Sequence, residues 1–369
     1  MEKLSPVEPI EVKKLHFDYN NPRLAEYGID EETGDSEILK VLWETMDVRE
    51  LVQSIHVSGF FPHEPLYVVK EGGKNIVIEG NRRLAAVKIL LDPELAKKNG
   101  WDVPDLSESA RADLQSLPVV MSKSREALWR FLGFRHVNGP AKWSSYAKAT
   151  YIAEVHHKWG IPLAQIAEQI GDYHNTVQRL YRGLMVLEQA EKKGVYNRAD
   201  SFRTKLAFSH LYTGLDYEEI SRFLELADKS KETKNPVPTK KIKALGELLT
   251  WLYGSKKEKV APVVQSQNPH LRQLSAVIGK RESLAALRAG EDLSRAFELS
   301  RPSSTILEES LLTGKRSLTT AQSHITTGYD KSEALLRIAG SVADIADDVY
   351  EQMRQKREGK GKKIAPRLS

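Results

Sequence analysis

The segment from Glu79 to Arg83 combines residue types that suit phosphate binding. It reads Glu-Gly-Asn-Arg-Arg and separates a run rich in β-branched residues from a strongly helical run. A glycine turn at the start of a helix presents free backbone N–H groups, and the guanidinium groups of Arg82 and Arg83 add positive charge at the same place. The segment therefore predicts an anion site. Its spacing alone is also typical of an ordinary helix start with two surface arginines.

A second segment, residues 163–182, has the pattern of a helix-turn-helix. Ala167 lies four residues before Gly171, and Val177 and Leu180 lie six and nine residues after it. Alanine lets two helices approach closely, and glycine permits the left-handed backbone that ends the first helix. Val177 and Leu180 would anchor the second helix in the core.

With these anchors inside, helical geometry turns a polar face outward. Asparagine and glutamine side chains pair with adenine edges, arginine pairs with guanine or phosphate, and a helix fits the major groove. We therefore predict that this face reads double-stranded DNA. The alternative is a helical hairpin that binds nothing. The residues expected to face DNA are Tyr173, His174, Asn175, Gln178, Arg179 and Arg182.

The elements that must position the first segment lie within residues 1–123, which we predict to be a mixed α/β domain. Apolar spacing predicts a helix over residues 37–59 that ends at Gly59. Strands are expected over residues 65–70 and 75–79, with a turn between them. A helix over residues 84–91, a looser stretch over 93–116 and a strand over 117–121 complete the domain.

Helical periodicity dominates the rest of the chain, so the predicted fold class is α+β with a helical remainder. We expect a helix-turn-helix domain over residues 124–190, a helical region over 191–356 and a basic tail over 357–369. Within the helical region, residues 229–243 and 255–269 have the composition of linkers or long loops. A last helix over residues 331–356 has an apolar seam that would pair two copies as a homodimer, bind a protein partner or fold back on its own domain.

Composition excludes several classes of protein. The 369 residues include 55 Lys and Arg against 50 Asp and Glu, a net charge of +5, and no cysteine. Disulfides, thiolate metal sites and cysteine nucleophiles are therefore excluded. No apolar run approaches the roughly 20 residues of a membrane span. We expect a cytoplasmic protein with no membrane partner.

Taken together, the motifs and their order resemble the ParB family of chromosome and plasmid partition proteins. The resemblance covers roughly residues 8–190 and is most specific at the glycine and two arginines of the Glu79–Arg83 turn, which is followed by the helix-turn-helix. It also includes Asn20-Asn21-Pro22-Arg23, Leu51-Val52-Gln53-Ser54-Ile55, Gly59 and Pro65-Leu66. It implies a nucleotide-gated clamp on DNA, associated with a bacterial nucleoid or a plasmid.

Site roles follow from this resemblance. It implies that the phosphates of a nucleoside triphosphate, CTP or ATP with Mg²⁺, are bound by Gly80, Asn81, Arg82 and Arg83, with Ser54, Gly59 and Pro65 near the nucleotide. Residues 133–140 replace the family's Glu-Asn-x-Gln-Arg segment, so the acid expected there is missing. Arg135 and Asn138 remain as candidates to contact phosphate or metal.

The sequence leaves an enzyme open as the alternative. The resemblance implies an amino-terminal fold that also occurs in nucleases and in small-molecule kinases. A nuclease or a nucleoside triphosphatase that is targeted to DNA by the helix-turn-helix would have the same order of motifs. Glu79 and His136 are the candidate catalytic residues, although they form no recognisable metal cluster in the sequence.

Overall fold

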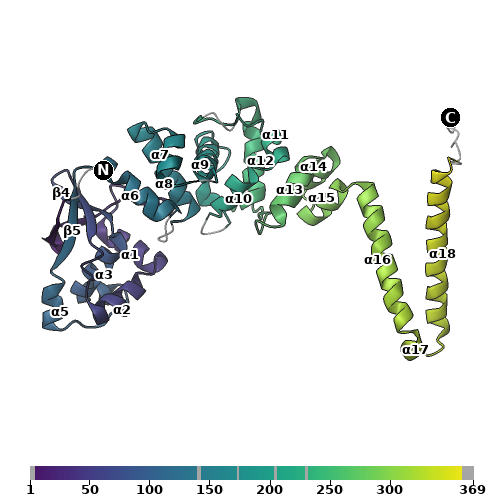
Figure 1. Cartoon of the computed structure of the whole chain (residues 1–369), viewed down its shortest axis with the longest axis horizontal. Coiled ribbons are helices and arrows are strands. Elements are labelled where there is room, and N and C mark those ends of the chain that lie inside the picture. Colours follow the sequence, from purple (N-terminus) through teal and green to yellow (C-terminus); the bar gives the residue numbers. More distant parts are fainter. Residues whose placement is uncertain (1–4, 139–142, 173, 203–205, 229–231, 360–369) are drawn as a thin grey trace. The chain divides into compact units, whose positions relative to one another are not determined.

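Figure 1 shows the computed structural model of the chain, which describes residues 5–138, 143–172, 174–202, 206–228 and 232–359. The chain divides into two compact units, Met1–Ser300 and Arg301–Ser369. The first unit contains a five-stranded sheet and most of the helices, and the described part of the second unit is helical. This content confirms the predicted α+β class.

The sheet is mixed in strand direction. Its order is β1-β5-β3-β4-β2; β3 is antiparallel to β4 and parallel to β5, β1 is antiparallel to β5, and β2 is parallel to β4. The sequence predicts β3, β4 and β5 but not β1 and β2, which are edge strands of only five and three residues and give little periodic signal. The strands are β1 (Val7–Glu11), β2 (Leu15–Phe17), β3 (Leu66–Glu71), β4 (Lys74–Glu79) and β5 (Ser116–Ser122).

The single helix predicted over residues 37–59 is wrong, because two helices occupy this segment. α1 (Asp35–Thr45) and α2 (Val48–Ser58) are separated at Asp47, which has a left-handed φ of 51°. Apolar spacing continues across the break because both helices pack into the same core. Gly59 ends α2 with a φ of 73°, as predicted.

Residues 93–116 are also more ordered than the sequence predicts. They contain α4 (Pro93–Lys98) and α5 (Glu108–Asp113). The side chain of Asp92 accepts a hydrogen bond from the first turn of α4, and Ser107 does the same for α5. These caps satisfy backbone N–H groups that a short helix leaves free, and they offset its weak intrinsic stability.

Both faces of β4 are buried, because its side chains alternate between two cores. Val77 packs into a core with α1, α2 and α3 (Asn81–Leu91), whereas Ile76 and Ile78 pack into the core of the helical region. The carboxyl end of β4, which carries the Glu79–Arg83 turn, therefore lies at the boundary between the two cores.

Helices fill the rest of the first unit, and one apolar core includes residues from Leu128 to Ala296. Residues 255–269 contain no helix, as the sequence predicts, while residues 239–243 are helical and 229–231 lie outside the described residues. The helices are α6 (Arg125–Gly133), the π-helical turn η3 (Phe134–Asn138), α7 (Ser145–Trp159), α8 (Leu163–Ile170), α9 (Thr176–Lys192), α10 (Phe208–Gly214), α11 (Glu218–Phe223), α12 (Ile242–Tyr253), α13 (His270–Ile278), α14 (Arg281–Arg288) and α15 (Leu293–Ser300). The domain boundaries at residues 123, 190 and 356 stay predictions.

The second unit consists of α16 (Ser303–Ser323), α17 (Ile325–Gly328) and α18 (Glu333–Arg357), and none of these helices has a buried residue. α18 confirms the helix predicted over residues 331–356. Residues 360–369 of the predicted basic tail lie outside the described residues. In the described part of the chain, no helix combines the length and apolar character needed to cross a bilayer.

Candidate functional site

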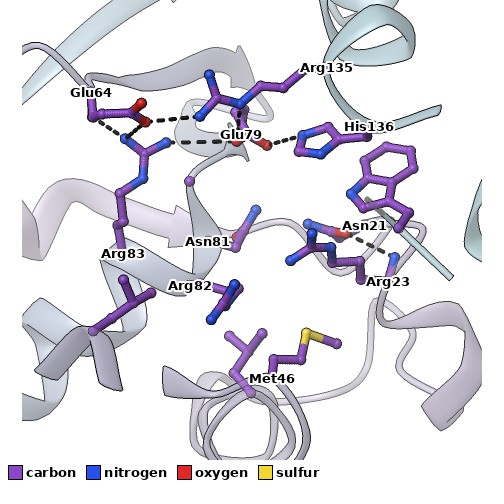
Figure 2. Close-up of a pocket in the computed structure, with 14 residues that line it drawn as sticks. Asn21, Arg23, Met46, Glu64, Glu79, Asn81, Arg82, Arg83, Arg135 and His136 are labelled. Atoms are coloured by element: carbon purple, nitrogen blue, oxygen red, sulfur yellow. Dashed lines mark hydrogen bonds and ion pairs between the residues drawn. The ribbon is translucent and has the colours of Figure 1, made fainter. Parts of the chain in front are cut away.

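A cavity of about 230 Å³ lies beside the Glu79–Arg83 turn, at the start of α3. Figure 2 shows that its wall comes from segments far apart in the sequence, including the loop after β2, the α1–α2 break, the loop before β3 and the segment after α6. The lining residues are Asn21, Arg23, Leu42, Met46, Leu51, Glu64, Glu79, Gly80, Asn81, Arg82, Arg83, Arg135, His136 and Trp143. Most of the residues predicted at the anion site are therefore brought together.

Gly80 makes the sharp turn from β4 into α3. Its φ is 105°, in a region that side chains disfavour. A Cβ at this position would lie 2.4 Å from Cδ2 of Leu66 and 3.2 Å from Nη2 of Arg83. Glycine is therefore required by both the backbone and the surrounding space, and the strand-turn-helix order predicted from the sequence is confirmed.

The side chain of Asn81, predicted to bind phosphate, is used inside the fold. It is 4% exposed, its Oδ1 accepts from the N–H of Asp18 at 3.1 Å, and its Nδ2 donates to the carbonyl of Val77 at 2.6 Å. These bonds hold the loop after β2 against α3. What Asn81 can offer a ligand is its backbone N–H, which lies in the first helical turn where α3 supplies no acceptor.

Arg23 and Arg82 are cations of the cavity with no carboxylate partner among the described residues. Arg82 donates to the carbonyl of Asp47 at 3.3 Å, and the guanidinium of Arg23 has no ion pair in this part of the chain. Burial lowers the pKa of Arg23, the charge of Arg82 lowers it further, and Glu79 opposes both effects. Two partly desolvated like charges that share one cavity favour an anionic ligand.

The other two arginines of the cavity are paired with acids. The shortest distances between the Glu64 carboxylate and the guanidinium nitrogens are 3.2 Å for Arg83 and 2.9 Å for Arg135. The corresponding distances from Glu79 are 3.7 Å and 3.4 Å. Arg83 and Arg135, both predicted to contact phosphate, therefore have charges that acids of the protein itself compensate.

Glu79 and His136, the candidate catalytic residues, bind each other. Oε2 of Glu79 lies 2.8 Å from Nε2 of His136, and the His136 ring stacks on Trp143 with centroids 4.5 Å apart. Burial opposes ionisation of Glu79, but the hydrogen bond and charge of His136, with the charges of Arg83 and Arg135, outweigh it and lower the pKa of Glu79. The pair therefore connects the end of β4 to the segment that precedes α7.

Some residues predicted near the nucleotide lie elsewhere. Ser54 is exposed on α2 and does not line the cavity, where α2 contributes Leu51 instead. Gly59 lines a separate cavity near β1. Pro65 is adjacent, since its carbonyl accepts from Arg83 at 3.5 Å. The side chain of Asn138 lies outside the described part of the chain.

The helix-turn-helix segment folds into α8 and α9, joined by a tight turn. Gly171 ends α8 with a φ of 69°, and the carboxylate of Asp172 accepts from the N–H of Val177 at 2.7 Å at the start of α9. Ala167, Val177 and Leu180, which are predicted to face inward, are buried, and Ile166 and Ile170 of α8 are buried beside them. The inward half of the pattern is therefore confirmed.

The outward half differs from the prediction. His174 and Asn175 are exposed, but Gln178, Arg179 and Arg182 are half-buried, and Tyr173 lies outside the described residues.

Later segments of the chain cover this part of α9. Arg179 pairs with Asp216 at 2.6 Å and lies over the ring of Tyr212, with its guanidinium 5.3 Å from the ring centroid. Arg182 donates to the carbonyl of Ala227 at 3.1 Å, and burial lowers its pKa. None of the six residues predicted to face DNA is acidic, but Asp216 brings a carboxylate to Arg179 from a distant part of the sequence.

Half of the residues that line the cavity were not predicted as site residues, and Arg23, Glu64 and Trp143 are the polar or aromatic examples that matter most for the site. Arg23 belongs to the Asn20–Arg23 segment that contributed to the family resemblance, so a signal for it existed. Tryptophan is typical of a hydrophobic core, and no feature of the sequence distinguishes a core tryptophan from one that lines a cavity, so Trp143 was not identified. Glu64 lies in a turn and carries no sequence signal.

Comparison with known proteins gives weak similarities. No family model matches the sequence, and no curated protein matches it significantly. One solved structure similar to the chain is the C-terminally truncated chromosome-partitioning protein ParB from Caulobacter crescentus complexed to the centromeric parS site, with 14% identity and a TM-score of 0.30 over 65% of this chain and 99% of that one. Another is the same truncated protein complexed with CTP-γ-S, with 15% identity and a TM-score of 0.21 over 58% of this chain and 94% of that one.

Proposed function

We propose that this protein binds a nucleoside triphosphate, CTP or ATP, with its phosphates in the cavity at the start of α3, and binds double-stranded DNA through α8 and α9. Nucleotide occupancy would switch DNA affinity, in a ParB-like role in partition, mobile-element maintenance or regulation. The observation that carries the proposal is the pair Arg23 and Arg82, two cations without a carboxylate partner among the described residues.

The size of the cavity favours the phosphate tail over a whole nucleotide. Drug-sized ligands occupy pockets of roughly 300–1,000 Å³, whereas this cavity holds about 230 Å³. The free N–H groups of the first turn of α3 and the positive end of its dipole add to the two guanidinium groups. We infer that the phosphates lie inside and that the base lies outside, where other contacts select it.

Mg²⁺ is the cofactor that the resemblance implies, and the residues of the cavity do not form a protein-held site for it. The described residues contain no group of three metal-ligating side chains. The cavity acids Glu64 and Glu79 are both engaged with arginines.

The DNA proposal rests on the residues that lead into α9. A recognition helix contacts base edges mainly with residues at its N-terminal end. His174 and the N-cap residue Asn175, which immediately precede the helix, are exposed, and asparagine matches the donor and acceptor pattern of adenine. Gln178, Arg179 and Arg182 stay predicted DNA contacts. Arg179 and Arg182 could contact DNA only if the segment that contains Asp216 and Ala227 left their guanidinium groups accessible.

A homodimer is the quaternary state that α18 supports. Its Leu335, Ile338, Ile345 and Met353 are each exposed by 45% or more. A helix in a protein gains most of its stability by packing its apolar face against another element. The exposed apolar seam of α18 therefore indicates a partner. Two-fold protein symmetry also matches a palindromic DNA site. We expect light scattering to give twice the mass of one chain, and Ile338→Asp with Ile345→Asp to give a single chain.

One experiment tests the switch directly. Labelled CTP and ATP are titrated against the protein with and without DNA fragments, and DNA binding is measured with and without nucleotide. Linkage requires that each ligand change the affinity for the other by the same factor. Nucleotide binding that leaves DNA affinity unchanged would remove the switch and keep two independent binding sites.

An enzyme is the second candidate, and the contact between Glu79 and His136 favours it. A carboxylate that orients an imidazole is a common arrangement for a general base, and both residues line the cavity. Release of phosphate from CTP or ATP would indicate a nucleoside triphosphatase, and plasmid cleavage in the presence of Mg²⁺ would indicate a nuclease. Either activity would have to be abolished by His136→Asn to support an enzymatic role.

A further inference from the structure

The two acids of the cavity differ in exposure. The side chain of Glu64 is 51% exposed and that of Glu79 is 13% exposed. A single oxygen of Glu64, Oε2, lies 3.2 Å from Nη1 of Arg83 and 2.9 Å from Nη2 of Arg135. Figure 2 shows this carboxylate between the two guanidinium groups. One solvent-accessible carboxylate therefore bridges two arginines that are far apart in the sequence.

These arginines are held in place by more than the Glu64 carboxylate. Arg83 also donates to the backbone carbonyls of Glu64 and Pro65. Glu79 lies within ion-pair distance of both guanidinium groups and is buried at the end of β4. The carboxylate of Glu64 is thus the part of the network most able to leave, and Arg83 and Arg135 would keep their positions when it does.

A carboxylate and a phosphate compete for the same donors, because both present oxygens that match the planar guanidinium group. The cavity beside this network already contains Arg23 and Arg82 without acid partners among the described residues. A ligand with one phosphate can be accommodated by those two cations. A ligand with a longer polyphosphate chain can extend to the donors that Glu64 occupies.

We propose that Glu64 is an internal competitor of the ligand's phosphates. In the free protein its carboxylate occupies Arg83 and Arg135, and a polyphosphate ligand displaces it into solvent. This inference rests on the proposed nucleotide binding. Its consequence is that Glu64 weakens binding of every polyphosphate and has no effect on a monophosphate, which does not reach the two arginines.

The test is isothermal titration of the full chain and of Glu64→Gln with CTP, ATP, CMP and inorganic tripolyphosphate. We expect the variant to bind the triphosphates about three- to tenfold more tightly, the size expected for loss of a partly exposed ion pair that competes with the ligand. CMP affinity should be unchanged. Glu64→Ala is measured in parallel, with the same expectation, in case one variant does not fold.

Glu247→Gln is the matched control. Glu247 pairs with Arg288 at 2.8 Å, away from the cavity, and its substitution changes the net charge by the same amount. We expect no change in triphosphate affinity for this control. An equal gain with Glu247→Gln would attribute the effect to overall charge and would overturn the inference.

Thermal melting separates competition from a structural role. Glu64→Gln loses two ion pairs, so the melting temperature of the free variant should be equal to or lower than that of the wild type. Its increase on adding triphosphate should nevertheless be larger. If the wild type binds triphosphate and Glu64→Gln binds it equally or more weakly, the inference fails and the proposed function stands. If neither protein binds CTP, ATP or tripolyphosphate, both fail.

Discussion

The cavity at the start of α3 and the outer face of α9 are both rich in arginine, but individual arginines differ in whether a carboxylate pairs with them. In the cavity, Arg23 and Arg82 lack acid partners among the described residues, whereas Arg83 and Arg135 are paired with Glu64 and Glu79. On α9, Arg179 is paired with Asp216, and Arg182, like Arg82, donates to a backbone carbonyl. Arginine content alone therefore does not define an anion site, because a distant segment can supply the counter-charge.

The Gly80 turn is the structural basis of the cavity, so we expect its substitution to have the largest effect. Gly80→Ala places a Cβ 2.4 Å from Leu66 at a φ of 105°. Overpacking and backbone strain together should lower the free energy of unfolding by about 3 kcal/mol, as measured by urea denaturation.

Gly73→Ala is the control for that substitution. Gly73 also has a positive φ, of 80°, but a Cβ added there would meet no atom within 4 Å. The substitution should cost only about 1 kcal/mol, from the backbone alone. Equal losses for the two variants would show that the space around Gly80 does not matter.

Removing a cation from the cavity should produce the next largest effect. Arg82→Ala deletes a charge-assisted contact to phosphate and should weaken triphosphate binding about 10- to 100-fold. Arg179→Ala, which removes the same group from α9, should leave nucleotide affinity unchanged. Titration with labelled nucleotide measures both, and a similar loss for the two variants would contradict the contrast between the two regions.

Acid should weaken the network around Glu79 in a defined direction. The folded-state pKa of Glu79 is below its ordinary value of 4.5, so ionised Glu79 stabilises the folded protein. This contribution to the free energy of unfolding is fully present above pH 4.5 and is lost as the pH falls through the lower, folded-state pKa of Glu79. Urea denaturation over this range should show a weaker acid dependence for Glu79→Gln than for the wild type. Identical pH profiles would argue against the ionised network.

The smallest effect is expected for the ion pair on α9. Asp216 and Arg179 are about one-third exposed, so Asp216→Asn should change stability by less than about 1 kcal/mol. It should raise DNA affinity at low salt, because it frees a guanidinium beside the proposed recognition surface. Glu218→Gln, which breaks the exposed pair with Arg222, is the control with the same change in charge. Weaker DNA binding by Asp216→Asn would instead mean that Asp216 positions Arg179 for DNA.

Local patterns identified several elements correctly because short-range physics dictates them. The two glycines, Gly80 and Gly171, mark turns that need a left-handed backbone, and both turns are present. Ala167, Val177 and Leu180 pack inside as their spacing requires. The break between α1 and α2 was not predictable, because the apolar spacing continues through it.

Long-range pairing limited the prediction of side-chain roles. Asn81 has the residue type and position of a phosphate ligand, but Asp18 and Val77 take up its amide group. Ser54 belongs to a segment of the family resemblance, yet it lies outside the cavity. The role of Asn81 depends on a partner far away in the sequence, because Asp18 and Asn81 are separated by 63 positions.

Three features follow from local sequence or composition: the strand-turn-helix at residues 74–91, the turn between α8 and α9, and a basic, cysteine-free chain. Each of them depends on backbone preference, local spacing or composition. Which charges remain available depends instead on long-range contacts. Glu64, Glu79 and Asp216 approach particular arginines through folding, and electrostatic pairing falls off over a few ångströms. Arg23 and Arg82 remain without acid partners in the described part of the chain for the same reason.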